Sequence, residues 1–300
     1  MNNMYRKYTP FLFIAPFFIL YFIFQFFPML FSFFISFTKW SGAGLPEFVG
    51  LKNYTRLLTD RLFFKSVTNT LLLMVISIPV QMFTGLLLSI LLKDFTSRSR
   101  SVFQLLNFLP YLAAPVALGF LFQLLFDWKT GTVNIALMQL GLVKDPYYWL
   151  GNVLGARFVV IFLGFWRYYG YMMVFFLTGL STVPEELYEA AIIDGANWIQ
   201  RHIKITLPML RSIMTFVVTT SIIGSWKIFD EPRILFTASG ARGPTGGPER
   251  SLLTIVLNFY DTAFQRFEFG YGTAIAFALF VIIFVFSGVS MKISDRGGEI

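Results

Sequence analysis

Arg167 is the residue whose chemistry stands out, because it lies inside the charge-poor stretch from 158 to 180. A charge within such an apolar segment is costly, so it indicates a functional site by default. Tyr171 lies four residues later, on the same face of a helix, and Tyr168 directly follows the arginine. Rings that stack and groups that donate hydrogen bonds suit a sugar. We therefore expect these three residues to line the path of a polar solute, and the guanidinium leaves an acidic saccharide open.

A second set of small polar residues occurs in the stretch from 209 to 229. Ser221 and Ser225 are four residues apart, and Gly224 leaves space beside them. We expect these three residues to face the same path. Two alternatives stay open: Arg167 could extend outward along the apolar surface, and tyrosines at this depth could serve packing alone.

Other polar residues near these stretches are expected to be structural. Where the fifth apolar stretch ends, we expect a solvated rim of ion pairs formed by Lys227, Asp230, Glu231 and Arg233, with a gate as the less favoured alternative. Amide side chains within apolar stretches are expected to bond between helices, namely those of Gln25, Gln81, Gln104, Asn107 and Gln123.

Several kinds of chemistry are excluded by composition. The chain has no cysteine and one histidine, His202, so neither a disulfide nor a Cys- or His-based metal site is expected. No phosphate-binding loop of the G-x-x-x-x-G-K-[ST] type occurs; the nearest candidate, Gly240 to Gly246, is followed by Gly247-Pro248. We expect no catalytic residue, no metal site and no ATP hydrolysis by this chain.

The elements that must position these residues are membrane-spanning helices. The 300 residues are 56% hydrophobic and only 13% charged, which is typical of an integral membrane protein. Charge-poor stretches long enough to cross a bilayer occur at about 11–37, 67–92, 101–126, 158–180, 209–229 and 270–290. We therefore expect an all-α protein with six transmembrane helices in one domain, 1–300, in which prolines kink the helices without breaking them.

The charge pattern predicts which side each loop faces. The net charge of +8 is ascribed to loops of a membrane protein and not to binding of nucleic acid. The link from Lys93 to Arg100 carries three basic residues and one acid. Basic loops face the cytoplasm, so we expect both termini there. The outer loop from Thr237 to Pro248 is expected to be flexible.

The segment 182–208 lies between the fourth and fifth stretches and so faces the cytoplasm under this topology. Thr182 followed by Glu185 has the form of a capping box, which predicts a helix start. Gly195 is expected to end or bend that helix, and Pro208 fits the first turn of the next spanning helix. The product is a helical elbow, with two interpretations: a loop that packs beneath the bundle, or a surface that docks another protein.

This elbow resembles a known family signature. Glu189-Ala190-Ala191, then Asp194-Gly195, then Ile205 and Leu207-Pro208 resemble the EAA motif of bacterial ABC-importer permeases. Further groups resemble its carbohydrate branch, the maltose and glycerol-phosphate type, and in particular the first of its two permeases. These groups are Asn69-Thr70, Leu109-Pro110, Gly131 with Asn134, and Phe264 through Gly270-Tyr271-Gly272. The likeness covers most of residues 8–292.

The resemblance implies a type I ABC importer with a MetI-like permease fold in the bacterial cytoplasmic membrane. A second homologous permease would complete the pathway as a heterodimer within membrane lipid, and an extracytoplasmic binding protein would deliver a sugar or oligosaccharide. Two ATPase subunits would bind ATP and Mg²⁺, so this chain would hold no cofactor. The elbow would be the coupling helix, with Glu189 making a charge-assisted contact and Gly195 permitting the bend.

Two competing function classes remain. A self-contained secondary carrier or channel is expected to show inverted repeats and intramembrane carboxylates, and neither is visible in the six stretches. A membrane enzyme would need a catalytic constellation, and the stretches contain none.

Overall fold

The computed structural model describes the chain except for residues 1, 94, 96, 238–244 and 297–300. Most of the loop expected to be flexible, 237–248, thus lies outside the described residues. The contacts group the chain into two compact units, residues 1–63 with 258–280 and residues 64–257 with 281–300. The helices α4 (Arg61–Lys93), α14 (Ile255–Tyr260) and α15 (Phe269–Arg296) each run through a boundary between the units. The expectation of one domain stays a prediction.

The first unit joins the N-terminal helices to the start of α15. Asn53 ties α3 to the segment after α2, because its Nδ2 donates to the carbonyls of Ser36 and Thr38, each at 2.8 Å. Gly270 lies so close to Thr38 that a Cβ atom would stand 1.9 Å from its carbonyl oxygen. The elements are α1 (Asn2–Tyr21), the π-helix η1 (Phe22–Phe26), α2 (Phe27–Ile35), β1 (Thr38–Lys39), β2 (Glu47–Phe48), α3 (Lys52–Leu57) and the π-helix η5 (Asp261–Gln265). The two strands pair antiparallel, Thr38 opposite Phe48.

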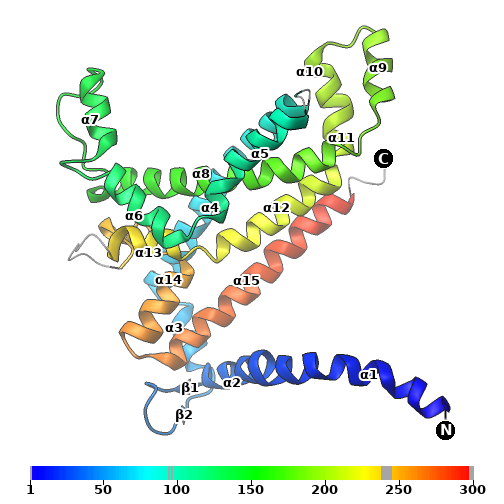
Figure 1. Cartoon of the computed structure of the whole chain (residues 1–300). Helices are drawn as coiled ribbons and strands as arrows, with labels where there is room; N and C mark the ends of the chain where they lie inside the picture. The colour runs from blue at the N-terminus through cyan, green and yellow to red at the C-terminus, as the bar shows by residue number, and fades with distance from the viewer. Residues whose placement is uncertain (1, 94, 96, 238–244, 297–300) are drawn as a thin grey trace. The chain divides into compact units, whose positions relative to one another are not determined.

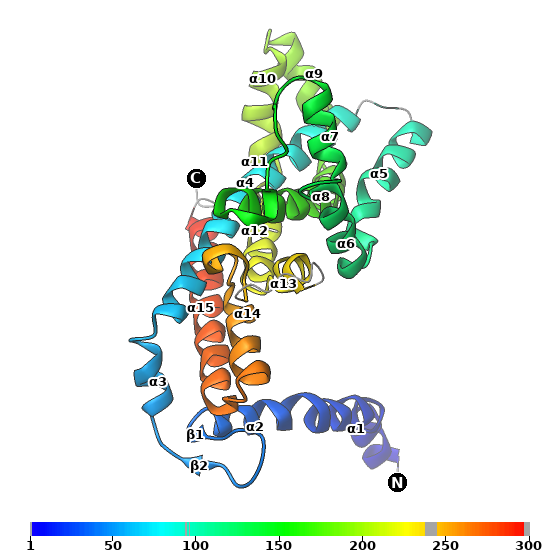
Figure 2. The same ribbon diagram turned by 90° about the vertical axis from the view of Figure 1, so that its left-hand side faces the viewer.

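The second unit is built around one long central helix, α8 (Val153–Leu180), which Figures 1 and 2 show running through its middle. Its buried residues Ala156, Val159, Val160 and Leu163 form a core with side chains from α4, α6 and α13. The other elements are α5 (Ser97–Leu112), α6 (Pro115–Leu125), α7 (Thr132–Gln139), η2 (Trp149–Gly151), α9 (Glu185–Ile193), α10 (Trp198–Arg201), the π-helix η3 (His202–Thr206), α11 (Leu207–Met209), α12 (Arg211–Trp226), α13 (Asp230–Thr237) and η4 (Pro248–Arg250).

Helices α5 and α8 approach each other unusually closely at Gly170. A Cβ atom there would stand 1.8 Å from the carbonyl oxygen of Asn107, so only glycine fits. Next to this contact, the hydroxyl of Tyr169 donates to Oδ1 of Asn107 at 2.8 Å. Between α6 and α13, Nε2 of Gln123 donates to the carbonyl of Leu235 at 2.9 Å. Asn107 and Gln123 therefore bond between helices, as the sequence predicts.

Five helices within the described residues are long and apolar enough to cross a membrane, or up to six if a bent pair is one span. The five are Thr9–Ile35, Arg61–Lys93, Val153–Leu180, Arg211–Phe236 and Phe269–Lys292. Apart from one two-stranded sheet, the regular structure of the described residues is helical, so this is an all-α protein, as the sequence predicts.

The third stretch, 101–126, departs from the expectation of kinks without breaks. α5 and α6 meet at an angle of 93°. Pro110 lies within α5 without breaking it, whereas α6 starts at Pro115 after Ala114, whose ψ of 130° is extended. A residue before proline is driven out of the helical region by a clash with the proline ring, so the helix ends here. The expectation was wrong at this position because Pro115 drives Ala114 out of the helical region, so the chain breaks between α5 and α6 instead of only bending.

Candidate functional site

The first limb of the elbow, α9, begins at Glu185 with Pro184 as the N-cap residue. The capping box expected from Thr182 and Glu185 is not formed, because Oγ1 of Thr182 donates instead to the carbonyl of Gly179, at 2.8 Å. The hydroxyl of Thr182 therefore bonds to the end of the preceding helix, α8, and does not cap the start of α9. Glu185 and Glu186 in the first turn of α9 favour the helix through its dipole.

Gly195 ends α9 in a left-handed conformation, with φ of +79°. Its amide donates to the carbonyl of Ile192 at 3.0 Å, and the amide of Ala196 donates to that of Ala191 at 2.8 Å. This pair of bonds is a Schellman motif, which satisfies the last carbonyls of a helix and suits glycine because it has no Cβ. The chain therefore reverses direction at Gly195.

The second limb starts from a true capping box. Oδ1 of Asn197 accepts from the amide of Gln200, and Oε1 of Gln200 accepts from the amide of Asn197, each at 2.9 Å. α10 then continues as the π-helix η3 and as α11, whose first turn contains Pro208. The spanning helix α12 begins only at Arg211, because Leu210 leaves the helical region and separates α11 from α12. The expectation that Pro208 stands in the first turn of the spanning helix was therefore wrong.

Thr206 joins the two limbs. It is fully buried, and its Oγ1 lies 2.8 Å from the hydroxyl of Tyr188 on α9 and 2.8 Å from Nδ1 of His202. Lys93, at the end of α4, places its Nζ 3.9 Å from the centre of the Tyr188 ring and 3.7 Å from Oε1 of Glu185. The elbow is therefore an internally bonded element that is held against α4.

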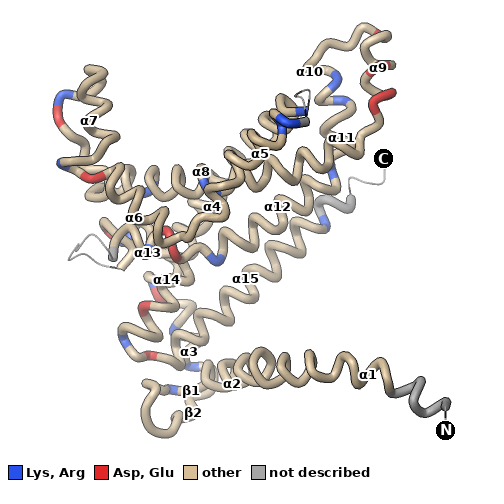
Figure 3. Tube along the Cα trace, viewed as in Figure 1, with Lys and Arg blue, Asp and Glu red and all other residues tan. Residues whose placement is uncertain are grey.

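The outer surface of the elbow carries the predicted coupling residues and several exposed apolar side chains. Glu189, Ala190, Asp194, Gly195 and Pro208 are exposed, whereas Ala191, Ile205 and Leu207 are half-buried. Ile193 is 86% exposed, and further exposed apolar side chains are Leu187, Ile192, Trp198, Ile199 and Ile203. Figure 3 shows acidic residues on α9, with basic residues on α10 and at the start of α5.

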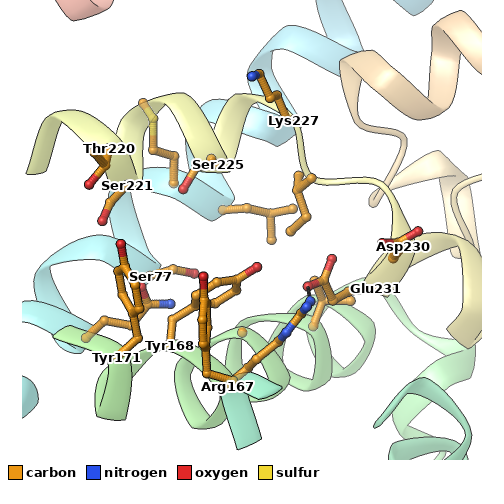
Figure 4. Close-up of a pocket in the computed structure, with 18 of the residues that line it drawn as sticks. Ser77, Arg167, Tyr168, Tyr171, Thr220, Ser221, Ser225, Lys227, Asp230 and Glu231 are labelled. Carbon is orange, nitrogen blue, oxygen red and sulfur yellow. Dashed lines mark hydrogen bonds and ion pairs between the residues drawn. The ribbon is translucent and has the colours of Figure 1, made fainter. Parts of the chain in front are cut away.

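A cavity of about 380 Å³ lies in the second unit, between α4, α8 and α12 and beside the start of α13. All six residues expected to line a solute path take part in its wall: Arg167, Tyr168, Tyr171, Ser221, Gly224 and Ser225. Tyr171 also stacks on Tyr111 of α5, with ring centres 4.6 Å apart. In Figure 4, α12 carries the hydroxyl groups on one side and α8 carries Arg167 and the tyrosines on the other. The structure brings these residues together, and their part in transport stays a prediction.

Glu231 corrects the expected rim of solvated ion pairs. Its side chain is only 6% exposed, and its Oε1 lies 2.8 Å from Nη1 of Arg167, which is 13% exposed. Asp230, the preceding residue, is exposed. The start of α13 turns Glu231 inward, toward a helix 64 residues away in the sequence. Local charge pattern alone gives no signal for such a pair.

Arg157 was not singled out by the sequence, and Asn69 was noted only as part of the family resemblance. Nη2 of Arg157 on α8 donates to Oδ1 of Asn69 on α4, at 3.1 Å. Nδ2 of Asn69 donates to the carbonyls of Arg250 and Leu253, at 2.9 and 3.2 Å. This arginine holds the segment before α14 against two helices, and a signal for it was its place at the margin of a charge-poor stretch. Among the described residues, no three His, Cys, Asp or Glu side chains form a group that could hold a metal ion.

Comparison with known proteins assigns the architecture that holds this cavity and elbow. Residues 62–296 match the family described as "Binding-protein-dependent transport system inner membrane component". The chain belongs to this family. It is therefore a multi-pass membrane permease of an ABC transporter, and such a subunit is not itself an enzyme.

Relatives of this permease carry names of saccharide transporters. It is 35% identical over 294 residues to the arabinooligosaccharides transport system permease protein AraP of Bacillus subtilis, covering 96% of this chain and 89% of the relative. It is 32% identical over 278 residues to the lactose transport system permease protein LacF of Rhizobium radiobacter, covering 92% and 90%.

The permease also shares its fold with a solved structure. It superposes with a TM-score of 0.83 on a chain of a bacterial ABC transporter involved in the import of the acidic polysaccharide alginate, covering 98% of each chain. The two sequences are 22% identical, so this likeness concerns the fold alone.

Proposed function

We propose that this permease forms, with a second homologous permease, the pathway of a sugar importer in a bacterial cytoplasmic membrane. An extracytoplasmic binding protein delivers the sugar or oligosaccharide, and two ATPase subunits bind ATP and Mg²⁺ beneath the pathway. This chain then needs no cofactor of its own. The names of AraP and LacF support a saccharide as the transported solute.

The observation that carries the proposal is the elbow. It lies between the spans Val153–Leu180 and Arg211–Phe236, and it exposes Ile193 by 86% and Ile192 by 55%. Apolar side chains gathered on an exposed surface mark an interaction site. Because the limbs are bonded to each other through Thr206, the elbow can move as one rigid unit. These features support docking into an ATPase subunit, with the elbow on the cytoplasmic side.

The cavity supports the proposal that the transported solute is a saccharide. Its volume of about 380 Å³ lies within the range of small-molecule sites. Tyrosine rings of α8 line one side and the serine hydroxyls of α12 the other, a combination that suits sugar rings and their hydroxyl groups.

The coupling role of Glu189 is tested by Glu189→Gln in the assembled importer, reconstituted in liposomes. If its carboxylate makes a charge-assisted hydrogen bond to a basic group of the ATPase, uptake of sugar should fall by about tenfold or more. Glu186→Gln is the matched control, since Glu186 is also an exposed acid of α9. Its effect should be smaller.

Two outcomes would contradict the proposal. Unchanged uptake in Glu189→Gln would remove this carboxylate from the coupling contact. Sugar uptake by the permease alone, in liposomes without ATPase subunits or ATP, would replace the importer with a self-contained carrier.

A further inference from the structure

The charge of Arg167 is cancelled within the wall of the cavity. Its guanidinium contacts the carboxylate of Glu231 at 2.8 Å, and both side chains are almost entirely shielded from solvent. The two other charged residues of the wall, Lys227 and Asp230, are exposed, and Figure 4 shows both extending away from this pair. The cavity thus contains a positive and a negative group that neutralise each other.

The remaining polar groups of the wall are neutral. Gln81 is 5% exposed, and its amide and the hydroxyls of Ser77, Ser221 and Ser225 take part in the wall. Nε of Arg167 is buried without a hydrogen-bond partner among the described residues. The buried Nε of Arg167 is costly to leave unpaired, and the amide and hydroxyl groups of the wall can each donate and accept hydrogen bonds. The wall therefore favours a ligand that brings hydroxyl groups. A sugar hydroxyl can both accept from Nε and bond to a serine.

The carboxylate of an acidic sugar would bind less favourably in this cavity than a hydroxyl group. It would meet Glu231, whose negative charge repels it, and an arginine whose charge is already used. Both effects are strong here because the pair is shielded from water.

We propose that Glu231 is a specificity-determining residue, which makes this cavity select neutral saccharides and reject uronates. The proposal rests on the proposed function, in which the cavity is part of the sugar path. The sequence, with Arg167 alone, left open whether the saccharide is neutral or acidic. The proposal decides for a neutral one. In this proposal Arg167 donates a hydrogen bond to the sugar. Its positive charge does not attract an anion, because Glu231 neutralises it.

The test measures binding to the assembled importer in nanodiscs, without the binding protein, by saturation-transfer NMR. The probes are maltotriose, β-1,4-mannotriose and arabinotriose, each paired with its derivative in which primary hydroxyls are oxidised to carboxylates. Removing the binding protein is essential, because its own selectivity would otherwise hide that of the cavity. The measured quantity is the ratio of affinities within each pair.

Three variants separate charge from shape. Wild-type importer should prefer at least one neutral trisaccharide over its oxidised partner by about tenfold or more. Glu231→Gln, which exposes the charge of Arg167, should lower or invert this ratio by about tenfold. The double variant Arg167→Gln with Glu231→Gln restores a neutral wall and should return the preference toward neutral sugar. Asp230→Asn makes the same charge change one residue away and should alter the ratio less, because Asp230 is exposed.

The outcomes distinguish this inference from the proposed function. If no saccharide of either kind binds to the wild-type importer, the cavity is not a sugar site and the proposed path fails. If neutral and oxidised sugars bind wild type equally, or if Glu231→Gln leaves the ratio unchanged, the specificity role of Glu231 is overturned while the sugar path stands.

Discussion

Asn134 shows how one side chain can hold a loop of this permease together. It is fully buried, and its Nδ2 donates to the carbonyls of Asp127, Trp128 and Tyr147, at 3.0 to 3.3 Å. Its Oδ1 accepts from the amide of Tyr147 at 3.2 Å and from Nε1 of Trp149 at 2.9 Å. Each end of the amide therefore meets partners of the opposite kind, which fixes the turn before α7 against the start of α8.

Asn134→Ala should destabilise the permease by about 2 to 4 kcal/mol, because the backbone groups and the Trp149 indole that bond to this amide all lose that hydrogen-bond partner. The measurement is the midpoint of thermal unfolding in detergent. Asn152→Ala serves as the control. Asn152 caps α8, with Oδ1 accepting from the amide of Gly155 at 2.7 Å, and makes one long further bond, from Nδ2 to the carbonyl of Tyr148 at 3.4 Å. Its loss should cost about 1 kcal/mol. Equal midpoints for the two variants would contradict the hub role of Asn134.

Residues at this scale differ in how well sequence reveals them. Arg167 and Tyr171 were recognisable because a charge and a ring at helical spacing stand out in an apolar stretch. Glu231 was not, because its partner is 64 positions away and its neighbours Asp230 and Arg233 suggest a solvated cluster. Whether a carboxylate faces solvent or lines the cavity is decided by its burial. That burial depends on the direction in which the chain runs from α12 into α13.

At the scale of elements, the elbow follows closely from short-range patterns. Gly195 takes a φ of +79°, and a Cβ atom added there would meet nothing within 4 Å. Only backbone strain therefore opposes replacement, at about 1 to 2 kcal/mol for an L-residue with a Cβ. The residue is needed for the turn and not for a close approach.

Gly195→Ala should therefore weaken coupling by loosening the reversal between α9 and α10, with uptake of sugar by the reconstituted importer reduced several-fold. Gly195→Asn is the matched control, because asparagine enters the left-handed region more readily than alanine. It should retain more uptake than the alanine variant. If asparagine is the worse of the two, the glycine is required for contact with a partner and not for its conformation.

The break between α5 and α6 illustrates the limit of pattern at this scale. A count of apolar residues finds one stretch, 101–126, whereas the structure has two helices at 93°. Packing at Gly119 explains the direction of α6, because a Cβ atom there would stand 2.4 Å from Cγ2 of Ile234 on α13. Proline chemistry locates the end of a helix, but a neighbouring helix decides where the chain goes next.

For the whole molecule, the loops at the two ends of the helices are predicted to face opposite sides of the membrane. The distribution of basic residues predicts that the elbow faces inward and that the loop containing α7 faces outward. Residues 140 and 204 report on these loops, since Leu140 is 72% exposed and Lys204 is exposed. The chain has no cysteine, so single cysteines can be introduced without background.

Leu140→Cys should react with a membrane-impermeant maleimide in intact cells made permeable only at their outer envelope. Lys204→Cys should react only after the cytoplasmic membrane is opened. The two variants control for each other, because they reverse roles if the topology is inverted. Labelling of Lys204→Cys in intact cells would place the elbow outside and exclude its docking to a cytoplasmic ATPase.

The sequence by itself determined the helical membrane architecture, the approximate spans and the family, because apolar length and the EAA spacing are local properties of the chain. It also predicted which residues could line a sugar path, since their types and spacing are visible without coordinates. Only the tertiary structure decided that these residues share one cavity, and that Arg167 is neutralised by Glu231. The physical reason is that burial and pairing across helices depend on how α8, α12 and α13 pack, which no local pattern encodes.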